Sequence, residues 1–119
     1  MLTKVNRQRR ALFNAFYLQE VVESGPKVEV TWSLEDVRHS VRAVAEEGMR
    51  PDLVAKLFRR SGDEDMRMEC LNALHKMDSP ASRAEIGRLS ADPEVASKWR
   101  EAFAGLLRPS PPAAVSGDQ

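Results

Sequence analysis

The few side chains in this sequence that could act as a nucleophile and its base are poorly spaced for that chemistry. The single cysteine, Cys70, precedes His75 by five residues, which would suggest a thiolate and its proton acceptor. On a helix such a separation corresponds to ~500°, so the two side chains would point about 140° apart around the axis. We therefore interpret Cys70 as a buried structural thiol rather than a nucleophile.

Metal ligands are equally sparse. His39 and His75 are the only histidines, and neither is followed by Glu or accompanied by a Cys or Asp at metal-ligand spacing. The acidic run Asp63-Glu64-Asp65 lacks the closing Glu of a calcium loop, and acids at a helix N-terminus are explained by the helix dipole. Gly-rich phosphate loops, nucleophile elbows and kinase signatures do not occur. The sequence therefore predicts no metal, no cofactor and no catalytic activity.

The remaining polar signal is basic. One group, which we call the basic ridge, consists of Lys56, Arg59, Arg60, Arg83 and Arg88. Arg59 and Arg88 are 29 residues apart, so in a stack of equivalent helices they would lie ~10 Å from each other. We interpret the ridge as a surface that binds an acidic partner segment. A solvated face whose long side chains cover apolar surface is the alternative.

A second basic group lies near the N-terminus. This N-terminal basic patch consists of Lys4, Arg7, Arg9 and Arg10. The same stretch has apolar residues at near-helical spacing, which predicts one long helix over residues 1–24. We expect Leu12, Phe13 and Phe16 to face the core, because three large apolar side chains on one stripe would otherwise form an exposed patch.

Glycine and proline divide the rest of the chain. Residues 25–32 alternate apolar and polar positions without a second such run to pair with, which predicts an extended linker. Residues 33–107 contain several short helical patterns, and residues 108–119 are too poor in apolar residues to form anything but a disordered tail. Ser33 and Ser79 are expected N-caps, Asp92 with Pro93 is expected to open the last helix, and Gly48 is expected just after a helix end.

The helical part contains an internal repeat. A shift of 29 residues places Pro51 on Pro80 and Asp63 on Asp92. Apolar positions follow the same shift in four columns: Val37, Met66 and Val95; Val41, Cys70 and Trp99; Val44, Ala73 and Ala102; Ala45, Leu74 and Phe103. Leu57 and Ile86 correspond in the second helix of each unit. Two short helices per unit are typical of α-solenoids, in which each hairpin buries its apolar face on the next.

These residues resemble a known family. Asp63-Glu64-Asp65-Met66-Arg67 and Asp92-Pro93-Glu94-Val95, with the apolar columns that follow them, are similar to the acidic opening turns of bacterial HEAT-like repeats. The resemblance implies an all-α fold of about six helices, a short solenoid with HEAT-like repeats over residues 33–107 and the N-terminal helix covering one end. It also implies a scaffold for protein or nucleic-acid contacts. A generic irregular helical bundle is the alternative fold.

Length, charge and apolar content argue against several classes of function. The chain has 119 residues, 18 Lys plus Arg and 18 Asp plus Glu, so it is one domain with a formal net charge of zero. A balanced charge disfavours a nucleic-acid binder, and the absence of a long apolar run argues against a membrane protein. A single cysteine favours the cytoplasm. We expect a non-enzymatic adaptor that binds an acidic protein segment; a nucleic-acid-binding HEAT-like protein and a self-associating regulatory subunit, a homodimer, are the alternatives.

Overall fold

The computed structural model of the chain describes residues 2–23 and 33–108, with side chains from residue 6 onward. Within these residues it contains six α-helices and no strand: α1 (Leu2–Glu23), α3 (Leu34–Glu46), α4 (Pro51–Arg60), α5 (Glu64–Met77), α6 (Pro80–Ala91) and α7 (Ser97–Leu107). The all-α prediction is confirmed. The predicted linker 25–32 and the predicted tail, apart from Arg108, lie outside the described residues.

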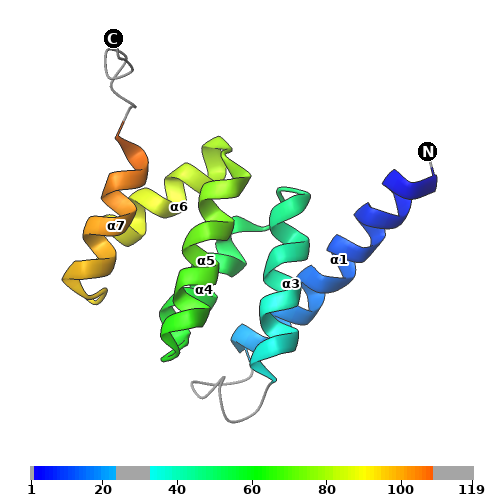
Figure 1. Cartoon of the computed structure of the whole chain (residues 1–119), viewed down its shortest axis with the longest axis horizontal. Coiled ribbons are helices and arrows are strands. Elements are labelled where there is room, and N and C mark those ends of the chain that lie inside the picture. The colour runs from blue at the N-terminus through cyan, green and yellow to red at the C-terminus, as the bar shows by residue number, and fades with distance from the viewer. Residues whose placement is uncertain (1, 24–32, 109–119) are drawn as a thin grey trace.

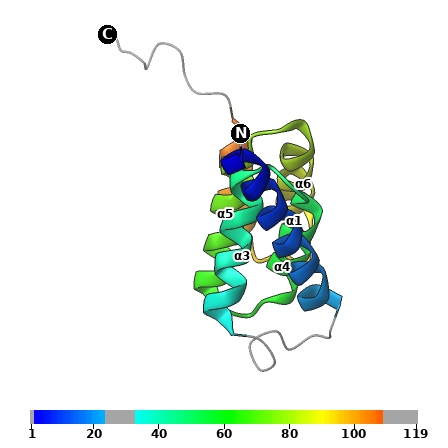
Figure 2. The ribbon, with the colours of Figure 1, turned by 90° about the vertical axis from the view of Figure 1, so that its right-hand side faces the viewer.

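The helices lie in two layers between two end helices. Figure 1 shows α1 at one end of the molecule and α7 at the other, with α3 to α6 between them. In the view of Figure 2, α3 and α5 lie side by side in one layer and α4 and α6 lie in the other. The end helix α1 packs on α3 and α4, whereas α7 packs mainly on α6. One broad face of α1 is therefore turned away from the rest of the molecule.

Side-chain caps fix where α3, α5 and α6 begin. The Asp63 carboxylate accepts a hydrogen bond from the backbone N–H of Met66 at 2.8 Å, which satisfies a free donor in the first turn of α5. At the start of α6, Ser79 and Ser82 form a reciprocal capping box. Ser33 caps α3 through its hydroxyl oxygen. The predictions for Ser33 and Ser79 are confirmed.

The end of α3 is a Schellman motif. The N–H of Gly48 donates to the carbonyl of Ala45 at 3.1 Å, and the N–H of Met49 donates to the carbonyl of Val44 at 2.9 Å. Gly48 has a φ of 65°, a left-handed conformation in which a residue without Cβ is favoured. The predicted helix end is confirmed at this glycine.

The prediction that Asp92 and Pro93 open the last helix is wrong, because α7 begins at Ser97. The Asp92 carboxylate instead accepts a hydrogen bond from the N–H of Glu94 at 2.9 Å, and the Asp92 carbonyl accepts one from the N–H of Val95 at 3.0 Å. Both bonds close a turn two and three residues ahead, a geometry that Asp favours. Asp92 therefore ends α6 and shapes the turn before α7.

The core follows the 29-residue spacing closely. Eleven of the twelve residues in the four apolar columns are buried, and Ala102 on α7 is the exposed exception. Leu57 and Ile86 are buried as well. The large aromatic residues of α4 and α7 meet at the C-terminal end of the core, where the rings of Phe58 and Phe103 pack edge to face at 5.0 Å.

Candidate functional site

All five residues of the basic ridge lie on α4 and α6, which form one layer of the molecule, and all are exposed. Lys56, Arg59 and Arg60 are on α4, and Arg83 and Arg88 are on α6. Because α4 and α6 pack against each other, the structure brings these residues to neighbouring helices of one layer.

Most of the ridge arginines already have carboxylate partners. The Nε of Arg59 donates to Oδ2 of Asp92 at 3.1 Å, and a guanidinium nitrogen of Arg88 lies 2.8 Å from Oε2 of Glu85. Arg83 pairs with Asp78. The two arginines that the repeat makes equivalent thus point to different acids, one in the turn before α7 and one on the same helix. An acidic partner would compete with these carboxylates for the guanidinium groups.

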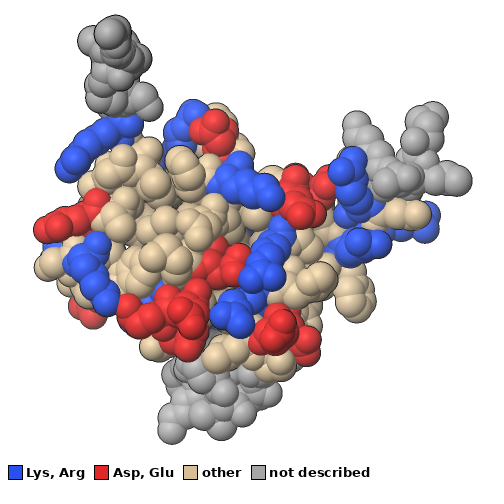
Figure 3. All heavy atoms as spheres, in the orientation of Figure 1, with Lys and Arg blue, Asp and Glu red and all other residues tan. Residues whose placement is uncertain are grey.

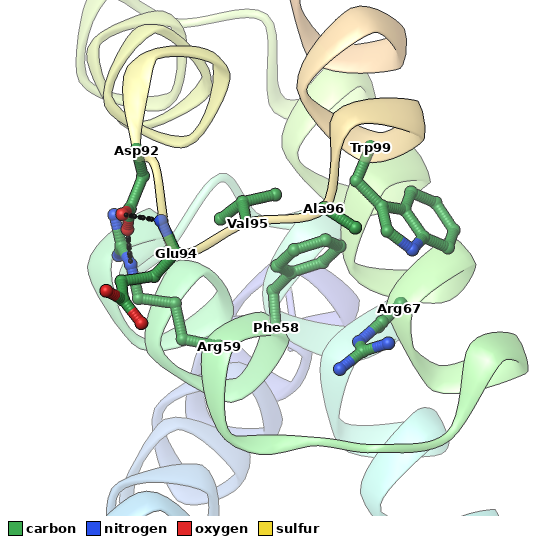
Figure 4. A pocket seen from close by; sticks show the side chains of 8 residues that line it. All are labelled: Phe58, Arg59, Arg67, Asp92, Glu94, Val95, Ala96 and Trp99. Atoms are coloured by element: carbon green, nitrogen blue, oxygen red, sulfur yellow. Dashed lines mark hydrogen bonds and ion pairs between the residues drawn. The ribbon is translucent and has the colours of Figure 1, made fainter.

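A shallow cavity of about 270 Å³ lies beside Arg59, between α4, α5 and the turn before α7 (Figure 4). Its lining is Phe58, Arg59, Arg67, Asp92, Glu94, Val95, Ala96 and Trp99. The rings of Phe58 and Trp99 meet edge to face at 5.4 Å, and the indole Nε1 of Trp99 is buried without a hydrogen-bond partner among the described residues. The rim carries the Arg59–Asp92 pair on one side and the guanidinium of Arg67 on the other. The cavity therefore combines aromatic walls with charged groups at its rim, of which Arg59 pairs with Asp92 and Arg67 with Glu64.

Asp92 is held as a carboxylate at this rim. Its pKa is lowered, first by the backbone N–H of Glu94 and next by the side-chain hydrogen bond from Arg59. A charged Asp92 keeps the Arg59 guanidinium engaged at neutral pH.

The N-terminal basic patch is in a different state. Arg7, Arg9 and Arg10 on α1 are exposed, and none of them makes an ion pair with a described residue. The side chain of Lys4 lies outside the described part. Figure 3 shows basic side chains gathered where α1 begins, whereas acidic and basic side chains alternate over the middle of the molecule. The positive charge of this patch is available to a partner.

Beside this patch, the expected core residues of α1 lie at the surface. The side chains of Phe13, Phe16 and Leu12 are 74 %, 61 % and 48 % exposed, so the prediction that they contribute to the core is wrong. The buried stripe of α1 is a different one, made by Ala11, Ala15, Leu18, Val21 and Val22. Its two alanines let α1 approach its neighbours closely, and this stripe turns the large residues outward.

We call Arg9, Leu12, Phe13, Phe16 and Glu20 the outer face of α1. A groove of about 320 Å³ runs along one side of this face, between Arg9 and Leu12 of α1 and Met49 of the turn after α3. Another groove of about 220 Å³ lies on the other side, where Phe13 of α1 faces His39 of α3. The sequence alone contained the signal for this surface, because the three apolar residues form a stripe of their own next to the arginines.

The residues considered for nucleophilic chemistry do not gather into a site. Cys70 is buried as predicted, and burial raises the pKa of its thiol, while His75 is exposed. The described residues contain no group of three or more His, Cys, Asp or Glu side chains placed to hold a metal ion. None of the described helices is long and apolar enough to cross a membrane.

Comparisons of the chain with protein-family models, with curated proteins and with solved structures find no match.

Proposed function

We propose that this chain is a non-enzymatic protein-interaction module and that the outer face of α1 binds an acidic, amphipathic segment of a partner protein. The observation that carries the proposal is the exposure of Phe13, Phe16 and Leu12 on one helix face. Scattered apolar residues on a surface are ordinary, but three large ones together on one face are typical of a binding surface. Amphipathic helices dock on such faces through residues at helical spacing.

The charges beside the outer face favour an acidic occupant. Arg9 lies on the outer face toward the N-terminal end of α1, Arg7 and Arg10 lie within two residues of it on the same helix, and none of the three makes an ion pair with a described residue. Carboxylates of a partner would form charge-assisted hydrogen bonds with the Arg9 guanidinium, and a basic group would be repelled at this end of the face. The basic ridge is the weaker candidate, because Arg59, Arg83 and Arg88 are already paired.

We propose in addition that α3 to α7 are a short HEAT-like stack that serves as a rigid support for α1. Two observations support this assignment: α3 packs beside α5 and α4 beside α6, and buried positions recur at the spacing of the internal repeat. In such a stack each helix pair buries the face of the next, and an end helix is left with one side open. That open side is the outer face of α1.

A synthetic acidic peptide tests the docking surface directly. The probe is a fluorescent helix-forming peptide with Leu at i, i+4 and i+7 and Glu on its flanks, titrated with the full chain and followed by anisotropy. We expect it to bind, and we expect the double variant Phe13→Ser/Phe16→Ser to weaken binding about tenfold or more, because aromatic anchors dominate such contacts. Both side chains are exposed in the chain, so circular dichroism should be unchanged.

Two controls locate the site and its chemistry. A peptide with Lys in place of Glu should not bind, and the double variant Arg59→Glu/Arg88→Glu should bind the acidic peptide as the unaltered chain does. Loss of binding in that variant would return the site to the basic ridge. A DNA duplex that binds with affinity falling steeply in salt would favour the nucleic-acid alternative. Equal binding of both peptides, or full binding by the Phe13/Phe16 variant, would overturn the proposal.

A further inference from the structure

The outer face of α1 has a pattern that is complementary to itself. Arg9, Phe13, Phe16 and Glu20 follow one another at spacings of four, three and four residues, which places them on one side of the helix. Arg9 is toward the N-terminal end, Glu20 is toward the C-terminal end, and the two phenylalanines lie between them. All four side chains are exposed.

The pattern is symmetric about the point midway between residues 14 and 15. Reversal of the helix about that point exchanges Phe13 with Phe16 and Arg9 with Glu20. Two copies of α1 laid side by side in opposite directions would therefore match aromatic residues with aromatic residues and Arg with Glu in a single register. One register of the two helices therefore satisfies the aromatic contacts and the charged contacts together.

We propose that the occupant of the outer face is the α1 helix of a second copy of this chain, paired antiparallel across a two-fold axis. This inference rests on the proposed function, since it names the acidic, amphipathic segment: the stretch of the second copy that carries Phe13, Phe16 and Glu20. In the pair, Arg9 of each copy faces Glu20 of the other, and Phe13 of each copy faces Phe16 of the other. The interface uses the same patch on both copies, as two-fold dimers do.

Charge decides between the two possible directions of the pair. In a parallel pair Arg9 would face Arg9 and Glu20 would face Glu20, and like charges across a helix interface oppose association. In the antiparallel pair both contacts are between opposite charges. The two helix dipoles also point in opposite directions, which is favourable for helices that lie side by side. The other charged residues of α1 favour the same direction. Arg7 and Arg10 are in the N-terminal half with Arg9, and Glu23 is in the C-terminal half with Glu20, so an antiparallel pair brings basic halves against acidic halves.

The expected strength of the dimer follows from its size. One helix pair with two aromatic contacts buries less than the roughly 1,200–2,000 Å² of a standard stable interface. We therefore expect a dissociation constant on the order of 10 µM rather than nanomolar affinity. A monomer would be the main species at chain concentrations well below this value, so the peptide titration above is to be performed in that range.

A charge-exchange experiment tests the register. Sedimentation velocity over a concentration series should show the unaltered chain passing from monomer to dimer. Arg9→Glu places an acid against Glu20 at both contacts, and Glu20→Arg places a cation against Arg9 at both contacts, so each variant alone should associate about tenfold more weakly or worse. An equimolar mixture of the two variants should dimerise again, because every contact in the mixed pair is once more between opposite charges.

A control variant and a measurement of helix content accompany this experiment. Arg88→Glu makes the same charge change on α6, away from the outer face, and should dimerise as the unaltered chain does. Circular dichroism should show that both α1 variants keep their helix content, since both side chains are exposed.

A chain that stays monomeric at millimolar concentration, or a mixture no more associated than its components, would overturn the inference. A monomeric chain that still binds the acidic peptide would leave the proposed function standing, and a dimer that binds no peptide would contradict the proposed function while keeping the self-pairing.

Discussion

Helix α1 and the C-terminal end of the core, where α4 meets α7, contain the same kinds of side chain in opposite environments. Phe58 and Phe103 are buried and pack edge to face, whereas Phe13 and Phe16 are mostly exposed. The arginines differ in the same way. Arg59 pairs with an acid from a neighbouring segment, while Arg9 makes no ion pair with a described residue.

This contrast shows that composition alone does not identify an interaction surface. Both regions contain phenylalanine and arginine, but at the C-terminal end of the core Phe58 packs on Phe103 and Arg59 pairs with Asp92. At neutral pH an incoming ligand there would compete with carboxylates and packed rings that are already in place. On α1 the same groups are left for another molecule, and desolvation of exposed phenyl rings would favour binding at roughly 25 cal/mol per Å² of apolar area.

The largest expected difference between the two regions is in the effect of truncating a phenylalanine to alanine. Phe103→Ala removes a fully buried ring, and we expect it to lower the free energy of unfolding by about 3–5 kcal/mol through lost burial and the cavity left behind. Phe16→Ala removes an exposed ring and should change the free energy of unfolding by no more than about 0.5 kcal/mol. Urea denaturation at low protein concentration measures both. Similar losses in the two variants would show that α1 is packed differently in solution.

Local rules account for the part of the fold that the sequence predicts well. The caps at Ser33 and Ser79 and the glycine at the end of α3 depend on side chain and backbone within a few residues, so they can be recognised from short motifs. The apolar columns were predictable for a related reason. Apolar residues that recur at a fixed interval mark the same side of equivalent segments of the repeat, and eleven of those twelve positions are buried.

The candidate surfaces were less predictable because tertiary contacts decide them. Helix α1 has two apolar stripes, and residue size favours the one with Phe13 and Phe16 as the core. The stripe with Ala11 and Ala15 faces the core instead, because small residues allow α1 to lie close to α3 and α4. Likewise, the partner of Arg59 lies 33 positions away in a turn, where no local motif could have placed it.

A smaller effect is expected at the buried polar contact that joins α1 to α3. The Ser40 hydroxyl donates to Oδ1 of Asn14 at 2.6 Å, and the Asn14 amide donates to the Arg10 carbonyl at 2.7 Å. Ser40→Ala leaves a buried amide oxygen unsatisfied, so the free energy of unfolding should fall by about 1–3 kcal/mol. Adding Asn14→Leu should cost less than the sum of the two single changes, because both polar groups are then removed together. Additive losses would mean that the two side chains do not bond in solution.

The smallest effect concerns whether Arg59 is engaged by Asp92 in solution, as the contrast between the two regions requires. The pKa of Asp92 is lowered in the folded chain, so its contribution to stability is present at neutral pH and is lost as the pH falls through that lowered pKa. Replacing Arg59 by Gln should raise the pKa of Asp92 only in part, because the backbone N–H of Glu94 is the larger cause of the lowering. Carboxyl-detected NMR titration measures this shift.

The matched change Arg88→Gln, which breaks a pair within α6, should leave the pKa of Asp92 where it is. Complete return of the Asp92 pKa to its ordinary value in Arg59→Gln would mean that the turn before α7 does not hold the carboxylate by itself. No change at all in Arg59→Gln would mean that the Arg59 guanidinium is free in solution. In that case the basic ridge would offer an unpaired cation next to the aromatic cavity, and it would compete with the outer face of α1 as the docking surface for an acidic partner.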